Sequence, residues 1–236
     1  MKFEILESGI KGAQENMDID QTLLQEISSF KHLLLRFYDW SGPSATYGYF
    51  IDPMKWLNAE GLKSQNIQLG RRPTGGGIVF HITDFAFSVL VPATHPAYSV
   101  NTLENYAFIN NIVGKAIKNF RQDTSPCLLT ADAKSRDESC KHFCMAKPTI
   151  YDVMVDGKKA GGAAQRRTRD GFLHQGTISL IKPEEKMLKE ILKPETQVLE
   201  AMKSQSYALV GSDCNETRLQ EARAALRDFL VSEFKK

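Results

Sequence analysis

Apolar residues along the chain follow two spacings, one typical of helices and one typical of strands. We expect helices over four segments: 13–28, 53–64, the segment that Asn101 begins, and 217–234. The Asn101 helix has Glu104 in capping-box position, and its apolar stripe, which includes Leu103 and Tyr106, is expected to belong to the core.

Short apolar runs and alternating patterns predict strands between these helices. The expected strands are 2–6, 33–38, a short one before residue 50, 78–80, 85–91, 148–155, one that begins at Lys158, and 171–181. Asp156 and Gly157 predict a hairpin turn of the primed type. The segment 122–147 is polar and irregular, and it is too long for a simple turn, so it is either mobile or functional.

Composition narrows the class of protein. The chain has 236 residues, of which 42% are hydrophobic and 25% charged, values typical of a globular protein with a core. A net charge of +2 gives no general attraction to nucleic acid or to a membrane, and no apolar run is long enough to span one. With no apolar signal segment at the N-terminus, we expect a cytoplasmic protein with free thiols at its four cysteines: Cys127, Cys140, Cys144 and Cys214.

The segment G-R-R-P-T-G-G-G-I-V-F-H, residues 70–81, contains the most unusual local sequence. Three consecutive glycines cost conformational entropy, which a flexible turn or a close approach to a ligand could explain. The preceding Arg71 and Arg72 favour binding of an anion. The loop is neither a Walker A motif, because Gly76 and Gly77 stand where Lys and Ser/Thr are required, nor a dinucleotide fingerprint.

This loop resembles the signature of the lipoate–protein ligase A family, within the biotin/lipoate ligase superfamily. A second segment, Y-D-V-M-V-D-G-K-K-A-G-G-A-A-Q-R-R, resembles the hairpin motif of the same family, and L-H-Q-G-T resembles its next strand. Thr46 stands where the family usually has Ser, and Gln175 replaces the second His of the ligase pattern. The loop typical of biotin ligases is absent.

The resemblance implies an α+β fold, with a mixed, mainly antiparallel sheet and packed helices. It implies a single catalytic domain over 1–236, with 182–236 as a helical C-terminal extension and no full accessory domain. The implied activity is attachment of lipoate or octanoate, through an acyl-adenylate made from ATP with Mg²⁺, to the acceptor lysine of a lipoyl domain. Such domains belong to 2-oxoacid dehydrogenases and to the glycine cleavage H protein.

The resemblance also assigns roles to individual residues. Lys159 would contact the acyl carbonyl and stabilise the charge that develops there. Asp152 would help to hold Mg²⁺, although a solvent-facing strand Asp is an equal alternative. The adenylate would be held by Arg71, Arg72, Gly75, Gly76 and Gly77. The remaining residues expected to shape the site are His81, Gly161, Gly162, His174, Gly176 and Thr177.

Cys144 supports an alternative route. Some members of the family are octanoyltransferases that carry the acyl group as a thioester on a cysteine four residues before a proline, and Cys144 stands four before Pro148. Such an enzyme would take octanoyl from acyl carrier protein, and a cation such as Lys159 would favour the thiolate. The alternative for Cys140 and Cys144 is an incidental pair, and a non-catalytic lipoate- or adenylate-binding module is a third hypothesis.

Overall fold

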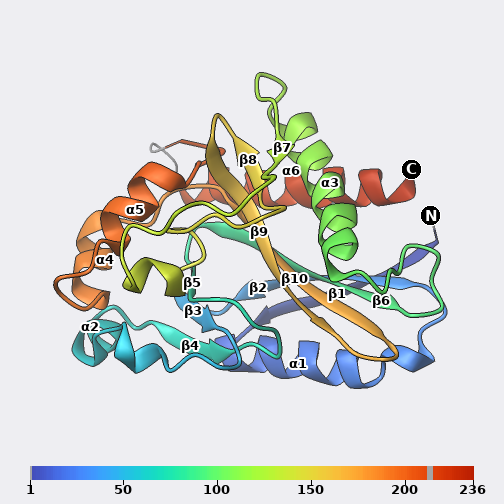
Figure 1. Cartoon of the computed structure of the whole chain (residues 1–236), viewed down its shortest axis with the longest axis horizontal. Helices are drawn as coiled ribbons and strands as arrows, with labels where there is room; N and C mark the ends of the chain where they lie inside the picture. The colour runs from blue at the N-terminus through green and yellow to red at the C-terminus, as the bar shows by residue number, and fades with distance from the viewer. Residues whose placement is uncertain (1, 212–214) are drawn as a thin grey trace.

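A seven-stranded sheet forms the centre of the computed structural model, which describes residues 2–211 and 215–236 (Figure 1). In spatial order its strands are β1 (Phe3–Lys11), β2 (Leu33–Trp40), β6 (Asp84–Pro92), β10 (Gly171–Ser179), β9 (Lys158–Arg167), β8 (Val153–Val155) and β7 (Cys127–Leu128). The β1–β2 pair is parallel, and the other neighbours are antiparallel. This arrangement confirms the expected mixed, mainly antiparallel sheet.

A smaller sheet lies beside the large one, in the order β4 (Gln68–Arg71), β3 (Ser44–Tyr47) and β5 (Val79–His81). The helices are α1 (Ala13–Gln25), α2 (Ala59–Ser64), α3 (Thr102–Phe120), α4 (Glu185–Ile191), α5 (Val198–Gln205) and α6 (Glu216–Lys235). Short 3₁₀ turns occur at Ile27–Ser29, Pro53–Lys55 and Ser139–His142. Cys214 lies outside the described residues.

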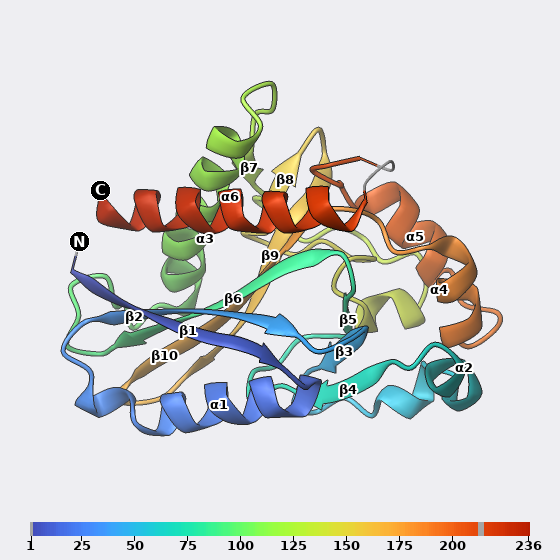
Figure 2. The same ribbon diagram turned by 180° about the vertical axis from the view of Figure 1, so that it is seen from behind.

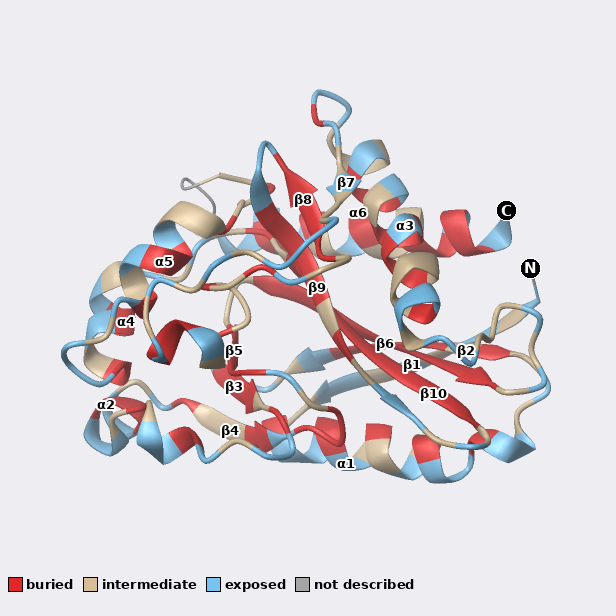
Figure 3. Cartoon of the chain, viewed as in Figure 1, coloured by how far each residue is buried: buried red, intermediate tan, exposed pale blue. Residues whose placement is uncertain are grey.

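Helices cover both faces of the large sheet. On one face α3 and α6 pack together, with α6 against β6 and α3 against β7, β8 and β9, and on the other face α1 packs through Leu24 against Leu90 and Leu173 (Figures 1 and 2). All nine residues of β6 are consequently buried, and Figure 3 shows the central strands as the most buried part of the molecule. A strand covered on both faces needs apolar residues at successive positions, as D-F-A-F-S-V-L-V-P provides.

A second apolar cluster holds the small sheet against the short helices. It joins Ile78 and Phe80, which follow the three glycines at 75–77, to Phe143 and to residues of α2, α4 and α5. Gly61 of α2 lies so close to the backbone of Glu190 that a Cβ atom would overlap it. Residues 139–146, here called the Cys144 segment, are thus packed against the small sheet and the short helices.

Several local predictions need correction. The helix expected over 53–64 is interrupted, because Asn58 begins α2 as its cap and its backbone N–H donates to Ile191. The strand expected over 148–155 is confined to β8, since Tyr151 has a positive φ of 68° and its carbonyl accepts from Asn110. Positive φ angles at Asp156 and Gly157 confirm the primed turn.

Two expectations concern helices. Helices α4 and α5, which the sequence pattern did not predict, are only seven and eight residues long. The Asn101 helix is confirmed, but its predicted core stripe is wrong at its first turns, where Leu103 is 44% exposed and Tyr106 is half-buried. In residues 2–211 and 215–236, no helix combines the length and apolar character needed to cross a membrane.

Candidate active site

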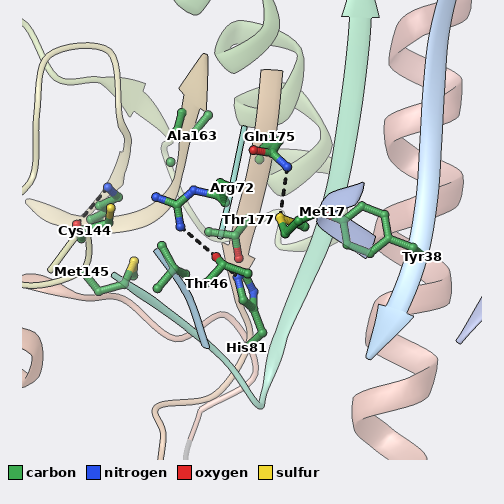
Figure 4. A pocket seen from close by; sticks show the side chains of 15 residues that line it. Met17, Tyr38, Thr46, Arg72, His81, Cys144, Met145, Ala163, Gln175 and Thr177 are labelled. Carbon is green, nitrogen blue, oxygen red and sulfur yellow. Dashed lines mark hydrogen bonds between the residues drawn. The ribbon is translucent and has the colours of Figure 1, made fainter. Parts of the chain in front are cut away.

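Cys144 lies where two adjoining cavities meet. The first, here called the inner cavity, is lined mainly by apolar atoms and runs from Cys144 and Met145 towards Met17 and Tyr38 (Figure 4). The second, here called the outer cavity, is more polar and includes the three loop glycines and Tyr106 in its wall. Cys144, Lys159, Ala163 and Ala164 line both cavities. A group on Cys144 would therefore face an apolar space on one side and a polar opening on the other.

Backbone hydrogen bonds hold the Cys144 segment against the glycine loop. Cys144 N donates to Ile78 O at 3.1 Å, and Ile78 N donates to His142 O at 2.6 Å. Asp137 accepts bonds from Ser139 Oγ, Cys140 N and Gln197 N, which hold its pKa below the usual range although burial opposes the shift. The last part of the polar segment 122–147, from Asp137 to Cys144, is therefore held by hydrogen bonds and supports the thiol.

The glycines allow the backbone to come close to its neighbours. Gly76 has a φ of 84°, a conformation that disfavours side chains, and a Cβ there would lie 3.8 Å from Cys144 Sγ. A Cβ on Gly77 would overlap the backbone at His142 and Phe143. At Gly75 nothing lies within 4 Å of such an atom. Gly77 is thus required by the approach of the loop to His142 and Phe143, and Gly76 by its positive φ.

Lys159 brings a buried positive charge to Cys144. Its Nζ donates to the carbonyl oxygen of Cys144 at 3.0 Å and pairs with Asp152 Oδ2 at 2.7 Å, with both side chains about 4% exposed. A Cβ on Gly162 would lie 2.5 Å from Lys159 Nζ and 2.6 Å from Asp152 Oδ1. Glycine at 162 therefore leaves the space that this ion pair occupies.

A chain of hydrogen bonds forms one wall of the inner cavity. Arg72 Nη1 donates to Thr46 Oγ1 at 2.7 Å, and the threonine oxygen lies 2.8 Å from His81 Nε2. On the other side of the ring, His81 Nδ1 lies 2.6 Å from Asp84 Oδ2, and because a carboxylate only accepts, this nitrogen is assigned the proton of that bond. Thr177 Oγ1 also donates to Asp84 Oδ2 at 2.5 Å. Threonine at 46 supplies the hydroxyl that this chain needs.

Arg72 itself is buried beside the thiol. Its Nη2 donates to the carbonyl oxygens of Gly75 and Gly77, and its Nε is buried with no partner among the described residues. Burial lowers the pKa of Arg72, and the nearby Cys144 opposes this shift. Similarly, burial raises the pKa of Asp84, but His81 and Thr177 hold it below its usual value. Arg72 thus holds the glycine loop and adds a second cation near Cys144.

A second buried network closes the far end of the inner cavity. Gln175 accepts from Thr74 Oγ1 at 2.7 Å and donates to Asp20 Oδ2 at 2.6 Å. Asp20 in turn pairs with Arg36 at 2.7 Å, and both side chains are fully buried. Gln175, the departure from the ligase pattern, therefore links the glycine loop to α1.

Tyr106 and His174 occupy a neighbouring position between α3 and the sheet. Tyr106 Oη accepts from Gln165 N, and burial raises the pKa of Tyr106 to about 12. His174 is fully buried, and desolvation lowers its pKa to about 3. Its Nδ1 accepts from the Gln165 amide, and its Nε2 has no partner in the described part of the chain. Both side chains are therefore neutral near pH 7.

The structure brings most of the predicted site residues together. The inner cavity is lined by Arg72, His81, Cys144, Lys159, Gly162, Gly176 and Thr177. The outer cavity is lined by Gly75, Gly76 and Gly77, together with Cys144 and Lys159. Four predicted residues line neither cavity: Arg71, Asp152, Gly161 and His174.

The sequence analysis missed the apolar wall. Met17, Tyr38, Val79 and Met145 line the inner cavity, and they come from α1, β2, β5 and the Cys144 segment. Hydrophobic patterning predicts that such residues are buried, and it does not distinguish a cavity from a filled core. The position of Met145 next to Cys144 was the one available signal.

The groups expected to bind a nucleotide and Mg²⁺ are engaged by the protein itself. Arg71 donates to Tyr49 O through Nε and Nη2 and lies 4.0 Å from the centre of the Tyr49 ring. Asp152 Oδ2 accepts from Thr149 N at 2.7 Å in addition to pairing with Lys159. No group of three or more potential metal-ligating side chains occurs among the residues described. Arg71 and Asp152 are therefore already engaged within the protein, and these two side chains do not fit a site for Mg²⁺ and the adenylate phosphate.

Comparison with known proteins identifies the class. The chain belongs to the family of the lipoyl protein ligase A/B catalytic domain, whose model matches residues 12–231. The octanoyltransferase LipM of Bacillus subtilis is 29% identical over 235 residues, which cover 96% of this chain and 84% of the relative. LipM of Carboxydothermus hydrogenoformans is 33% identical over 180 residues, 76% of this chain and 65% of the relative. The protein is therefore an enzyme of the lipoate ligase or octanoyltransferase kind.

Solved structures share the fold. A lipoate-protein ligase A bound with ATP matches with a TM-score of 0.73 and 21% identity, covering 100% of this chain and 86% of that one. A bipartite lipoate protein ligase from Thermoplasma acidophilum matches with a TM-score of 0.63 and 20% identity, covering 99% and 83%. These likenesses confirm the biotin/lipoate ligase-like fold predicted from the sequence motifs.

Proposed function

We propose that this protein transfers an octanoyl group from acyl carrier protein to the acceptor lysine of a lipoyl domain, with Cys144 as the covalent carrier. The observation that carries the proposal is the position of Cys144 at the junction of the two cavities, beside the buried cations Lys159 and Arg72. The resemblance to LipM octanoyltransferases supports this route over the ATP-dependent ligase that the glycine loop first indicated.

In the first proposed step, the Cys144 thiolate attacks the carbonyl carbon of the octanoyl thioester on the carrier. A new C–S bond forms to Cys144, the C–S bond to the carrier breaks, and the carrier thiolate leaves and takes up a proton. The apolar inner cavity would receive the hydrocarbon chain, and the outer cavity would receive the carrier's arm. Lys159 and Arg72 would favour the negative charge on the thiolate and on the tetrahedral intermediate.

In the second step, the neutral amine of the acceptor lysine attacks the thioester through the outer cavity. An amide bond forms, the C–S bond to Cys144 breaks, and the amine proton is released as the thiolate is regenerated. No group is oxidised or reduced, and the energy of the donor thioester suffices without ATP. Asp152 would hold the Lys159 side chain in place, which is a positioning role.

The proposed acceptors are the lipoyl domains of 2-oxoacid dehydrogenases and the glycine cleavage H protein. We propose that residues 1–236 act as one catalytic domain, with 182–236 supplying helices that support the Cys144 segment and the large sheet. Contacts of α5 and α6 in the two apolar clusters support this unit.

The test is an acylation assay with a purified lipoyl domain, followed by mass spectrometry of both proteins. One reaction contains octanoyl-acyl carrier protein without ATP, and the other contains free octanoate or lipoate with ATP and Mg²⁺. We expect product in the carrier reaction and one octanoyl group on Cys144 before the acceptor is added. Cys144→Ser should abolish both signals, because a serine hydroxyl is far harder to deprotonate than a cysteine thiol.

Cys127→Ser is the matched control, because Cys127 is exposed on β7 and lies outside both cavities. It should retain full transfer. Product only in the ATP reaction, unaffected by Cys144→Ser, would establish the ligase instead. Absence of product in both reactions would favour the non-catalytic binding module.

A further inference from the structure

A third cavity, here called the side cavity, adjoins the inner cavity. The two share Val79, Met145 and Thr177 in their walls. The side cavity continues away from Cys144 between β5, β10 and α5. Its walls are lined largely by apolar atoms, including those of Ile181, Pro183 and Met202. Only a thin layer of side chains therefore separates the proposed acyl site from further space.

The row of cavities extends to the surface. The side cavity shares Pro183, Met202 and Ser206 with another hollow, which opens beside Lys182 and Lys203 near α4 and α5. The side cavity has one charged wall residue, Asp84, whose Oδ2 is engaged by His81 and Thr177, while its Oδ1 is buried without a partner among the described residues. A hydrocarbon chain that passed Met145 would thus continue along apolar walls.

Buried polar groups close the opposite end of the inner cavity. Met17 is 2% exposed, and its sulfur lies 3.3 Å from the Gln175 amide nitrogen. Behind Gln175 stands the fully buried Asp20–Arg36 pair. Lengthening a chain in this direction would disrupt a buried ion pair, which is strongly unfavourable.

We propose that the side cavity is a latent subsite for acyl chains longer than octanoyl, which would turn at Met145 instead of running towards Met17, and that Met145 excludes them. The inference rests on the proposed octanoyl transfer. Met145 is half-buried, follows the nucleophile directly, and stands beside Cys144 at the near end of the inner cavity (Figure 4). Methionine has three flexible side-chain bonds and fills irregular gaps, so it closes the passage without rigid packing. Met145 is thereby a specificity-determining residue.

The experiment compares octanoyl- and dodecanoyl-acyl carrier protein as donors for the wild type and for Met145→Ala. Mass spectrometry follows the rate of thioester formation on Cys144. We expect Met145→Ala to raise the dodecanoyl-to-octanoyl ratio of rates at least about 10-fold, because several additional methylene groups are buried. Met17→Ala, which enlarges the opposite end, should leave the ratio within about twofold of the wild type. Met145→Ala/Met202→Trp should return the ratio towards the wild-type value, because it fills the side cavity.

A binding measurement separates this inference from the proposed reaction. Calorimetric titration with free octanoate and free dodecanoate requires no turnover, and circular dichroism establishes that each variant is folded. A gain of dodecanoate affinity in Met145→Ala that Met202→Trp reverses would support the subsite even if no thioester forms. A folded Met145→Ala variant with unchanged chain-length preference in binding would overturn it, as would a larger gain in Met17→Ala.

Discussion

Lys159 and Cys144 are joined through the main chain and not through the thiol. The Lys159 ammonium group donates to the Cys144 carbonyl oxygen at 3.0 Å. The same group forms an ion pair with Asp152 Oδ2 at 2.7 Å. The contact fixes the Cys144 segment to β9 and keeps a cation beside the place where an acyl oxygen would become negative. Lys159 thus has both a structural and a chemical role, and the two are separable by mutation.

Replacement of Lys159 by methionine should remove activity and stability together. The variant leaves Asp152 buried without its partner, so we expect a loss of about 3–5 kcal/mol in the free energy of unfolding. Lys159→Met/Asp152→Asn removes both charges and should recover most of that stability. Urea unfolding and the acylation assay, performed on the same preparations, measure the two effects.

The double variant should remain at least about 100-fold slower than the wild type, since loss of one fixed oxyanion-stabilising group costs that much in other enzymes. Recovery of the normal rate along with stability would mean that Lys159 only supports the fold.

Gly162→Ala tests the space that the ion pair requires. The new Cβ would lie 2.5 Å from Lys159 Nζ, so the lysine must move away from Cys144, and we expect transfer to fall at least about 10-fold. Gly114→Ala is the matched control on α3, where a Cβ meets only ordinary contacts at 3.8 Å. It should keep full activity and gain up to about 1 kcal/mol of stability. Equal rates for the two variants would contradict the proposed position of Lys159.

The link between Thr74 and Asp20 through Gln175 predicts a coupled loss of stability. Gln175→Leu removes the partner of two buried atoms, Thr74 Oγ1 and Asp20 Oδ2, and should cost about 2–4 kcal/mol in the free energy of unfolding. Thr74→Val removes the partner on the loop side and should cost about 1 kcal/mol. The double variant should lose less than the sum, because one unpaired group disappears. Strict additivity would show that the two side chains do not interact.

His174 predicts acid sensitivity of the fold. Its pKa falls from 6.5 to about 3 on folding, so below pH 6.5 the unfolded chain binds a proton that the folded chain does not. Its contribution to stability is therefore present above pH 6.5 and is lost towards pH 3, at about 1.4 kcal/mol per pH unit. Urea unfolding near pH 7.5 and near pH 5.5 measures the loss.

His174→Asn cannot titrate in this range and provides the comparison. The stability difference between wild type and variant should shift against the wild type by about 1.4 kcal/mol between these two pH values. The same change in both proteins would indicate that His174 is protonated in the folded state or that other groups control the acid response.

Patterning along the chain predicted the long elements well and the short ones poorly. α1, α3 and α6 bury a continuous stripe, so their spacing is visible in the sequence. α4 and α5 span about two turns each and are stabilised by the second apolar cluster, which brings together residues distant in the chain. β8 is short because Tyr151 adopts a conformation that only its surroundings stabilise.

The sequence by itself determined which residues were candidates for the site. The family is indicated by local features: three glycines in succession, the hairpin around Lys159 and a cysteine before Pro148. The glycines stand out because each costs conformational entropy on folding. Only the tertiary structure decided how these features are used. In the folded protein Asp152 pairs with Lys159, and His174 is buried outside both cavities. Arg72 is linked to His81 through the hydroxyl of Thr46. Such contacts depend on the packing of distant segments, which no local pattern encodes.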